Sequence, residues 1–496
     1  MTFPAHTVEK IGGTSMSRIH ELRDTLIVGD RKADALFHRV FVVSAFGGIT
    51  NLLLEHKKTG EPGVYALFAN DDNDHSWLDA LTRVAEAMGA CHNKVLHNAA
   101  DRTLAEDFVR DRIEGARNCL YDLRRLCSYG HFRLSSQMMI VRELLSGLGE
   151  AHSAYVTTLM LQRAGINARF VDLSGWRDET ECNLQARIAG AFQDIDLATE
   201  LPIVTGYAQC REGLMREYDR GYSEVTFSNI AAFTGAKEAI IHKEFHLSSA
   251  DPALFGAEQV RKLGHTNYDV ADQLSNMGME AIHPNAAKIL RQSKVALRVT
   301  NAFEPADPGT LIDEQAASAP GVEIITGLNV VALELFEQDM VGVKGCDAAA
   351  LDALRRHNVR IASKTSNANS ITHYVEAPLK IVRRVVSDLE DAYPSAKISA
   401  RNVAIVSAIG RDLSGLKAFS RGLMSLETAE IDLIAAHQTP RNVDIQFVVP
   451  REAADAAVMA LHAALVEASR EDHLQQVASA NNLQTRHRLV QYQKQV

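Results

Sequence analysis

Short apolar runs alternate with longer amphipathic segments between residues 6 and 300, and this alternation limits the possible folds more than any other feature. The runs are rich in apolar or β-branched residues, and Gly, Asn or Asp bound most of them, which is typical of strands. Strands separated by helices favour a mostly parallel α/β sheet that helices cover on both faces. The predicted strands are 6–10, 40–45, 167–172, 201–206, 238–243 and 295–300.

Composition excludes several classes of protein. The 496 residues include 52 Lys and Arg against 62 Asp and Glu, a net charge of −10 that argues against a nucleic-acid-binding surface. No apolar run approaches the ~20 residues of a membrane-spanning helix. The first residues do not resemble a signal peptide, and the six scattered cysteines lack a CxxC pair. We therefore expect a cytoplasmic protein with reduced thiols, without a membrane or nucleic-acid partner.

The chain changes character near residue 304. The run EPADPGTLIDEQAASAP is rich in Pro, Ala, Gly and acidic residues and is predicted to be a linker. Beyond it, predicted elements follow the order β-α-β-β-α twice, as in ferredoxin-like repeats. The predicted parts are a first domain over 1–315 with a helical subregion at about 55–135, repeats over 320–395 and 396–475, and a polar tail over 476–496.

The run KIGGTS directly follows the first predicted strand. Gly12 and Gly13 would let backbone amides approach an anion, and Thr14 and Ser15 add hydroxyl donors. Lys10 adds a positive charge. The run matches neither the Walker nor the dinucleotide-binding pattern. Taken alone, it fits a phosphate-binding turn or an ordinary tight turn between a strand and a helix.

Three further motifs carry residues with possible binding roles. In VVSAFGGITNLL, Ser44 and Thr50 could hydrogen-bond a carboxylate, although an ordinary strand-to-helix turn would look the same. In LGEAHSA, Glu150 is predicted to lie at a helix start, where it would either stabilise the helix dipole or bind a substrate ammonium group.

The third of these motifs is DRGYSEVTFSN, in a predicted turn that opens a helix. Its Arg220 offers a guanidinium suited to a carboxylate, and Ser223 adds a hydroxyl. Glu224 could organise Lys10 or a metal ion. A solvated turn with an acidic first helical turn is the alternative.

The four motifs occur in this order and at roughly this spacing in aspartate kinases. From about residue 6 to residue 467, the chain resembles that family of amino acid kinases with C-terminal ACT domains. The segments HTVEKIGGTSMS, NLLLEHKKTGEPGVY and DRGYSE look like the aspartokinases that accompany ectoine synthesis. The resemblance implies an amino acid kinase fold, with a mostly parallel sheet between helices, followed by two ferredoxin-like ACT domains.

The resemblance also implies the reaction, which is phosphoryl transfer from ATP with Mg²⁺ to the β-carboxylate of L-aspartate. The products would be 4-phospho-L-aspartate and ADP, at the first step of aspartate-family amino acid and ectoine biosynthesis. The expected ACT domains suggest an amino-acid effector and a homodimer or larger homo-oligomer. In the family's pattern, Glu224 would order Lys10. The phosphates would be bound by Lys10, Gly12, Gly13, Thr14 and Ser15. Aspartate would be bound by Ser44, Thr50, Glu150, Arg220 and Ser223.

Parts of the chain depart from the family's pattern. Tyr222 replaces a glycine and Glu224 an aspartate in RGYSE, and Glu280 stands where the family has a lysine. The run IHKEFHLSSADPA at 241–253 matches the family's nucleotide segment poorly, so the family's adenosine contacts are not carried over, and Lys243 and Ser248 are the candidates to replace them. His242 and His246 have metal-pair spacing only on a helix, so no metal site is expected there.

Two alternatives remain open at this point. One is another carboxylate or carbamate kinase of the same superfamily, and the other is a non-catalytic ACT-type amino-acid sensor.

Overall fold

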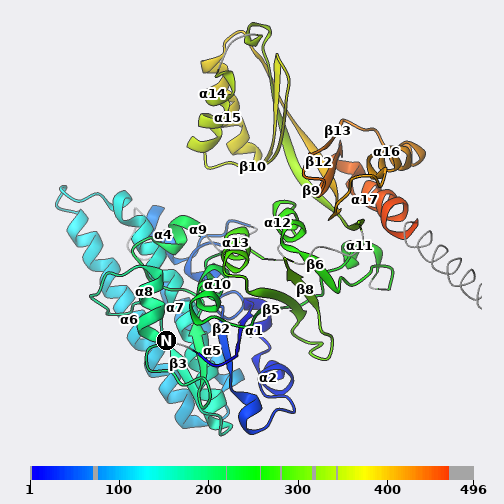
Figure 1. Ribbon diagram of the computed structural model, residues 1–496. Helices are drawn as coiled ribbons and strands as arrows, with labels where there is room; N and C mark the ends of the chain where they lie inside the picture. The colour runs from blue at the N-terminus through cyan, green and yellow to red at the C-terminus, as the bar shows by residue number, and fades with distance from the viewer. Residues whose placement is uncertain are drawn as a thin grey trace, which may run out of the picture. The chain divides into compact units, whose positions relative to one another are not determined.

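The computed structural model describes residues 3–57, 59–70, 76–218, 221–256, 258–279, 282–314, 320–341 and 345–468. The chain divides into two compact units (Figure 1). Unit 1 comprises Met1–Leu247 and Ile282–Glu314, and unit 2 comprises Ser248–Ala281 and Gln315–Val496. The predicted tail over 476–496 lies outside the described residues. No helix among the described residues is long and apolar enough to cross a bilayer.

A mostly parallel sheet forms the centre of unit 1. Its strands follow the order β3-β4-β2-β1-β5-β7-β8, and β8 alone among them runs antiparallel to its neighbour β7. Each strand that the sequence predicts before residue 304 is present, and the α/β prediction is confirmed. The bounds are β1 (Thr7–Ile11), β2 (Arg39–Val43), β3 (Ala168–Val171), β4 (Leu201–Thr205), β5 (Glu238–Lys243), β7 (Ala296–Asn301) and β8 (Thr310–Asp313).

Strand β8 corrects one expectation, because it lies inside the stretch predicted to be a linker. Thr310 and Ile312 are buried on one side of the strand and pair with Val299 and Leu297 of β7. This period-two burial was hidden by the surrounding Pro and Gly residues.

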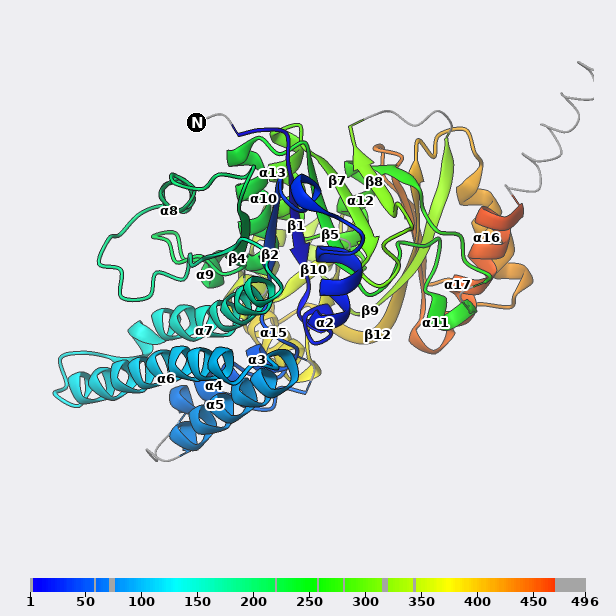
Figure 2. The same ribbon diagram turned by 90° about the horizontal axis from the view of Figure 1, so that it is seen from below.

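Three long helices dominate the part of unit 1 expected to be helical. Helices α5, α6 and α7 lie side by side and extend away from the sheet (Figure 2). Helix α7 runs well past residue 135 into the core. The helices of unit 1 are α1 (Gly13–Met16), α2 (Ile19–Leu22), α3 (Ile49–Leu53), α4 (Val64–Asn70), α5 (Ser76–Val95), α6 (Ala99–Cys127), α7 (Leu134–Arg163), α8 (Leu184–Ala191), α9 (Leu214–Tyr218), α10 (Tyr222–Thr234) and α13 (Pro284–Gln292).

Unit 2 is built on one antiparallel sheet, with the strand order β10-β11-β9-β12-β14-β13. Helices α14 and α15 pack near one end of its long strands, and α16 and α17 near the other (Figure 1). The strands are β6 (His265–Asn267), outside that sheet, and β9 (Gly321–Phe336), β10 (Arg360–Ser366), β11 (Ser370–Glu376), β12 (Lys397–Arg411), β13 (Ala435–Gln438) and β14 (Asp444–Pro450). The helices are α11 (Pro252–Phe255), α12 (Tyr268–Asn276), α14 (Cys346–Arg356), α15 (Leu379–Ala392), α16 (Ala418–Thr428) and α17 (Ala454–His462).

The two ferredoxin-like lobes share β9 and β12. Val331 of β9 lies in the core beneath α14 and α15, whereas Ile325 of the same strand lies in the core beneath α16 and α17. Each lobe therefore draws residues from both of the consecutive ranges expected at 320–395 and 396–475. The observed lobes differ from the two expected repeats because β9, with 16 residues, is long enough to contribute to two cores in succession.

The segment Ser248–Ala281 packs within unit 2, although the sequence analysis places it in the first domain. The backbone N–H of Ile325 donates to Ser249 O, and Ser249 Oγ lies 2.8 Å from a ring nitrogen of His462. Contacts of this kind between distant segments leave no pattern in the sequence.

Candidate active site

The motifs meet at the carboxyl edge of the unit 1 sheet. Strand β1 pairs in parallel with β2 and β5, so the residues that follow these strands lie at the same edge. The glycine turn begins where β1 ends, and α10 contacts β1, β2 and β5. Ser223 and Glu224 lie in the first turn of α10.

Lys10 and Glu224 form the central pair. Lys10 Nζ lies 3.5 Å from Glu224 Oε1, and both side chains are largely buried. Burial raises the pKa of Glu224, but the charges of Lys10 and Lys243 and a hydrogen bond from the backbone N–H of His283 outweigh it and leave that pKa below its usual value. Glu224 is therefore an anion at neutral pH, as an ordering partner of Lys10 must be.

Glu150 and Ser223 form a second pair beside the first. Ser223 Oγ donates to Glu150 Oε1 at 2.6 Å. Burial raises the pKa of Glu150 to about 8, although the Ser223 hydroxyl and the charge of Lys10 lower it in part. A carboxyl group in this state is mostly protonated at pH 7 and needs a cationic partner to ionise.

The expectation that Glu150 lies at a helix start is wrong. It lies in the middle of α7, which runs from Leu134 to Arg163. The role of a helix cap is thereby excluded, because the dipole effect is confined to the first turn. Gly147 and Gly149 directly before Glu150 had concealed the first half of the helix, because glycines are typical of turns.

Glycines let these elements approach closely. A Cβ on Gly206, at the end of β4, would lie 2.8 Å from Glu150 Oε2 and 2.9 Å from Ser223 Cβ. A Cβ on Gly149 would lie 2.9 Å from the Cβ of Ala45. Both positions exclude a larger side chain, and they fix α7 and α10 against the strand ends.

The glycine turn has the predicted form. Gly12 precedes α1, and a Cβ on Gly13 would lie 2.9 Å from Ala45 O, so the turn is pressed against the loop after β2. Thr14 is exposed, whereas Ser15 is buried and its Oγ donates to Glu244 Oε1 at 2.6 Å.

The other residues predicted to bind aspartate have no direct contact with these two pairs among the contacts described. Ser44 directly follows β2, where its backbone O accepts a hydrogen bond from Ser153 Oγ at 2.8 Å. Ser153 Oγ also lies 3.0 Å from Glu150 O, which ties the loop to α7. Thr50 is half-buried in α3. Arg220 lies outside the described residues.

Comparison of the chain with known proteins shows its family. The amino acid kinase family matches residues 6–301. Aspartate kinase Ask_Ect of Stutzerimonas stutzeri (strain A1501) is 50% identical over 477 residues, which cover 96% of this chain and 100% of that protein. The chain belongs to the aspartate kinases of the amino acid kinase family. The resemblance drawn from the four motifs is confirmed.

Solved aspartate kinases share the fold. E. coli aspartokinase III in complex with lysine and aspartate matches with a TM-score of 0.69 at 19% identity, over 93% of this chain and 99% of that one. The same enzyme with aspartate and ADP matches with a TM-score of 0.68 at 19% identity and the same coverage. The expected kinase fold followed by two ACT domains is thus confirmed.

Two residues near Glu224 were not expected from the sequence to contact it. His283 contributes a backbone N–H, which no side-chain pattern can reveal. Lys243 is the last residue of β5, and its signal was available, because a charged residue ending a predicted buried strand lies at the ligand-binding edge.

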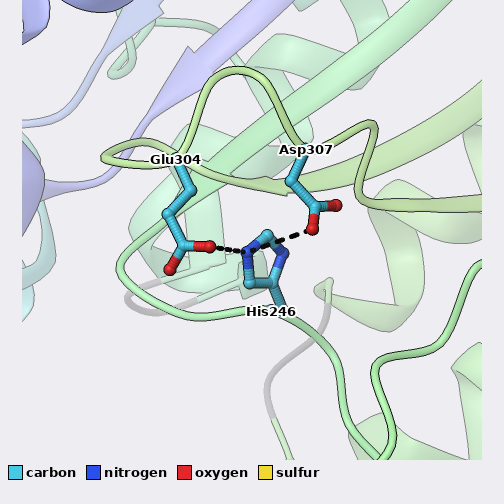
Figure 3. A group of neighbouring side chains, drawn as sticks. All are labelled: His246, Glu304 and Asp307. Carbon is cyan, nitrogen blue, oxygen red and sulfur yellow. Dashed lines mark hydrogen bonds and ion pairs between the residues drawn. The ribbon is translucent and has the colours of Figure 1, made fainter.

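His242 and His246 contact different groups of residues. His246 Nε2 lies 3.0 Å from Glu304 Oε2 and 3.9 Å from Asp307 Oδ2 (Figure 3). These three side chains could reach one metal ion. The hydrogen bond between His246 and Glu304 accounts for the arrangement without an ion, however, and Asp307 is held through Oδ1 by the N–H of Gly309.

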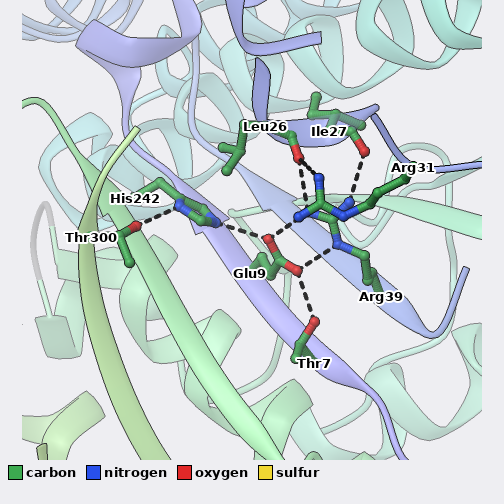
Figure 4. Close-up of polar contacts among 8 residues, drawn as sticks. All are labelled: Thr7, Glu9, Leu26, Ile27, Arg31, Arg39, His242 and Thr300. Carbon is green, nitrogen blue, oxygen red and sulfur yellow. Dashed lines mark hydrogen bonds and ion pairs between the residues drawn. The ribbon is translucent and has the colours of Figure 1, made fainter. Parts of the chain in front are cut away.

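His242 belongs to a buried network on the other face of the sheet (Figure 4). Its Nε2 donates to Glu9 Oε2 at 2.9 Å, and its Nδ1 lies 2.7 Å from Thr300 Oγ1. Arg39 binds the Glu9 carboxylate with two nitrogens, at 2.7 and 2.9 Å, and also donates to the carbonyls of Leu26 and Ile27. This network is internally complete and is not assigned to the site.

Proposed function

We propose that this aspartate kinase transfers the γ-phosphoryl group of ATP to the β-carboxylate of L-aspartate, giving 4-phospho-L-aspartate and ADP. The observation that carries the proposal is the buried pair of Lys10 and Glu224 beside the glycine turn. Identity of 50% to a named aspartate kinase along its whole length supports the same acceptor.

The chemistry requires positioning more than proton transfer. The β-carboxylate of aspartate, with a pKa of about 4, is already ionised at pH 7 and needs no general base. The protein has to align a carboxylate oxygen with the γ-phosphorus and stabilise the charge that spreads over the phosphate oxygens. Lys10, ordered by Glu224, would contact those oxygens, and the amides of Gly12 and Gly13 would donate to them.

The oxygen donors beside the glycine turn suit a magnesium ion. Ser15 Oγ and the Glu244 carboxylate lie together there, and Mg²⁺ commonly binds one or two carboxylates together with substrate phosphates. Ser15 and Glu244 would hold the ion, which when bound neutralises charge on the phosphates.

The buried Glu150 would bind the α-ammonium group of aspartate. An arriving cation would ionise this carboxyl group, so ammonium binding and proton release would be coupled. Ser223 orients the carboxylate. We assign the aspartate carboxylates to Ser44, Thr50 and Arg220, following the family's pattern.

We propose that unit 2 binds an amino-acid effector and contributes to a homo-oligomer. The matched E. coli enzyme is in complex with lysine as well as aspartate, which supports this class of effector. The run SAIGRDLSGL at 407–416 carries two glycines, which suggest a backbone loop that could hold an effector. Only Gly415 lies in a loop, because Gly410 belongs to β12, where a Cβ would clash with Gly321 O.

We place the reaction at the entry to aspartate-family amino acid and ectoine biosynthesis. The segments that resemble ectoine-associated aspartokinases support this placement, as does the identity to Ask_Ect.

The test is ADP release by the purified protein with Mg²⁺ and ATP, with hydroxylamine present to trap an acyl phosphate. L-Aspartate, L-glutamate, N-acetylglutamate and buffer alone are compared. We expect ADP and hydroxamate only with aspartate. Turnover with another acceptor would favour a related carboxylate kinase, and turnover with none would favour an amino-acid sensor.

A further inference from the structure

Lys243 shares a face of the sheet with Lys10. In the parallel pairing of β1 and β5, Lys10 lies opposite Ile241 and Ile11 lies opposite His242. Successive residues of a strand point to opposite faces, so Ile241 and Lys243 point to the face of Lys10. His242 points to the other face, toward Glu9. Two neighbouring strands therefore present lysines on one face, toward α10.

The charges around the glycine turn favour a second cation there. Lys10 is paired with Glu224, which stays anionic, and Glu244 adds a second carboxylate through its contact with Ser15. Glu150, the other acid of this region, is mostly protonated at pH 7 without ligand. Without Lys243, one lysine would face two carboxylates until a magnesium ion binds, and these three groups together would be negative. With Lys243, the charges balance.

We propose that Lys243 binds the phosphate chain of ATP as a second cation beside Lys10. The inference rests on the proposed function and adds a nucleotide-binding residue to it. Lys243 is half-buried at the end of β5, so its position is set by the sheet, not by a loop. Lys10 and Lys243 both lower the pKa of the Glu224 carboxyl group, so both cations act on the same carboxylate.

The experiment measures nucleotide binding directly. Dissociation constants of ATP with Mg²⁺, of ADP and of adenosine are determined by calorimetry for the wild type and for Lys243→Met and Lys243→Arg. Lys237→Met is the matched control, because Lys237 is an exposed lysine that immediately precedes the other end of β5. Circular dichroism and thermal unfolding establish that each variant is folded, and Lys243→Gln replaces the Met variant if that variant is not.

We expect Lys243→Met to weaken ATP and ADP binding about tenfold or more, as loss of a charge-assisted contact does. Adenosine binding should be unchanged, Lys243→Arg should retain most of the affinity, and Lys237→Met should match the wild type. Unchanged ATP binding in Lys243→Met would overturn the proposal. Equal weakening of ATP and adenosine would do the same, because it would show a structural role.

These outcomes are separate from a failure of the proposed function. A wild type that binds ATP but releases no ADP with aspartate would refute the aspartate kinase reaction, while the role of Lys243 would still be decided by binding. A wild type that binds no ATP would refute both.

Discussion

Glu9 and Lys10 are neighbours on β1, yet their side chains point to opposite faces of one sheet and lie in opposite electrostatic situations. On the Glu9 face, Arg39, His242 and Thr7 all donate to the carboxylate, and the network closes on itself. On the Lys10 face, a longer ion pair of 3.5 Å lies beside Glu150, a carboxyl group with a pKa near 8.

The two faces differ in how far their buried carboxyl groups are paired within the protein. A fully paired group stabilises the fold, whereas a poorly paired group can be paired by a ligand. Burial raises the pKa of Glu9, but the charge of Arg39 and the hydrogen bonds from His242 and Arg39 hold it well below the usual range. Nothing comparable compensates Glu150, which stays protonated instead. Perturbed carboxyl groups of the second kind, at the carboxyl ends of parallel strands, are typical of functional sites.

The largest expected effect is that of Lys10→Met. Removing a preorganised cation from the transferring phosphate should lower kcat about 10²–10³-fold, or more. The free energy of unfolding should fall less than in Arg39→Met, because Glu224 keeps the hydrogen bond from the backbone N–H of His283 and the charge of Lys243. Steady-state ADP release and urea unfolding measure the two quantities, and a variant with near-normal turnover would remove Lys10 from the site.

Arg39→Met should have the opposite profile. Removing one partner of a buried ion pair costs about 3–5 kcal/mol of unfolding free energy, because the buried Glu9 carboxylate loses its guanidinium and keeps only the contacts of Thr7 and His242. The loss should shrink as pH falls from 8 to 5, since Glu9 without Arg39 can then take up a proton. Activity per folded molecule should be nearly unchanged. Urea unfolding across this range checks the prediction, and full stability at pH 8 would contradict it.

Glu150→Gln should alter pH dependence on the Lys10 face. Because the folded-state pKa of about 8 is above the usual value, the wild type loses stability as pH rises toward and through 8, and the neutral amide should remove that loss. Aspartate affinity should rise with pH up to about 8 in the wild type, because only the ionised carboxylate attracts an ammonium group. In Glu150→Gln, aspartate affinity should be weak at every pH. A wild-type affinity that does not vary between pH 6.5 and 8.5 would refute this role.

Thr300→Val should have the smallest effect. It removes one hydroxyl from the ring of His242 and should cost about 1 kcal/mol of stability, without a change in KM for either substrate. Thr50→Val is the counterpart on the functional side, and it should raise KM for aspartate while leaving stability nearly unchanged. An equal change in KM for aspartate in both variants would contradict the functional difference between the two faces.

Much of this arrangement follows from the sequence. The strands of unit 1 were predictable because parallel strands are apolar over their whole length, and the motifs at their ends pointed to Lys10, Ser223 and Glu224. The Glu9 network was not predictable, since Glu9 and Arg39 look like surface residues until strand order places them together. Glu150 was expected at a helix start and lies within α7 instead, because Gly147 and Gly149 look like a turn before a helix.

The most direct measurement is ³¹P NMR of the wild-type protein with ATP, Mg²⁺ and L-aspartate. The account predicts an acyl phosphate resonance that grows with ADP and is absent when aspartate is omitted. Formation of ADP and inorganic phosphate alone, at a rate that aspartate does not change, would contradict it.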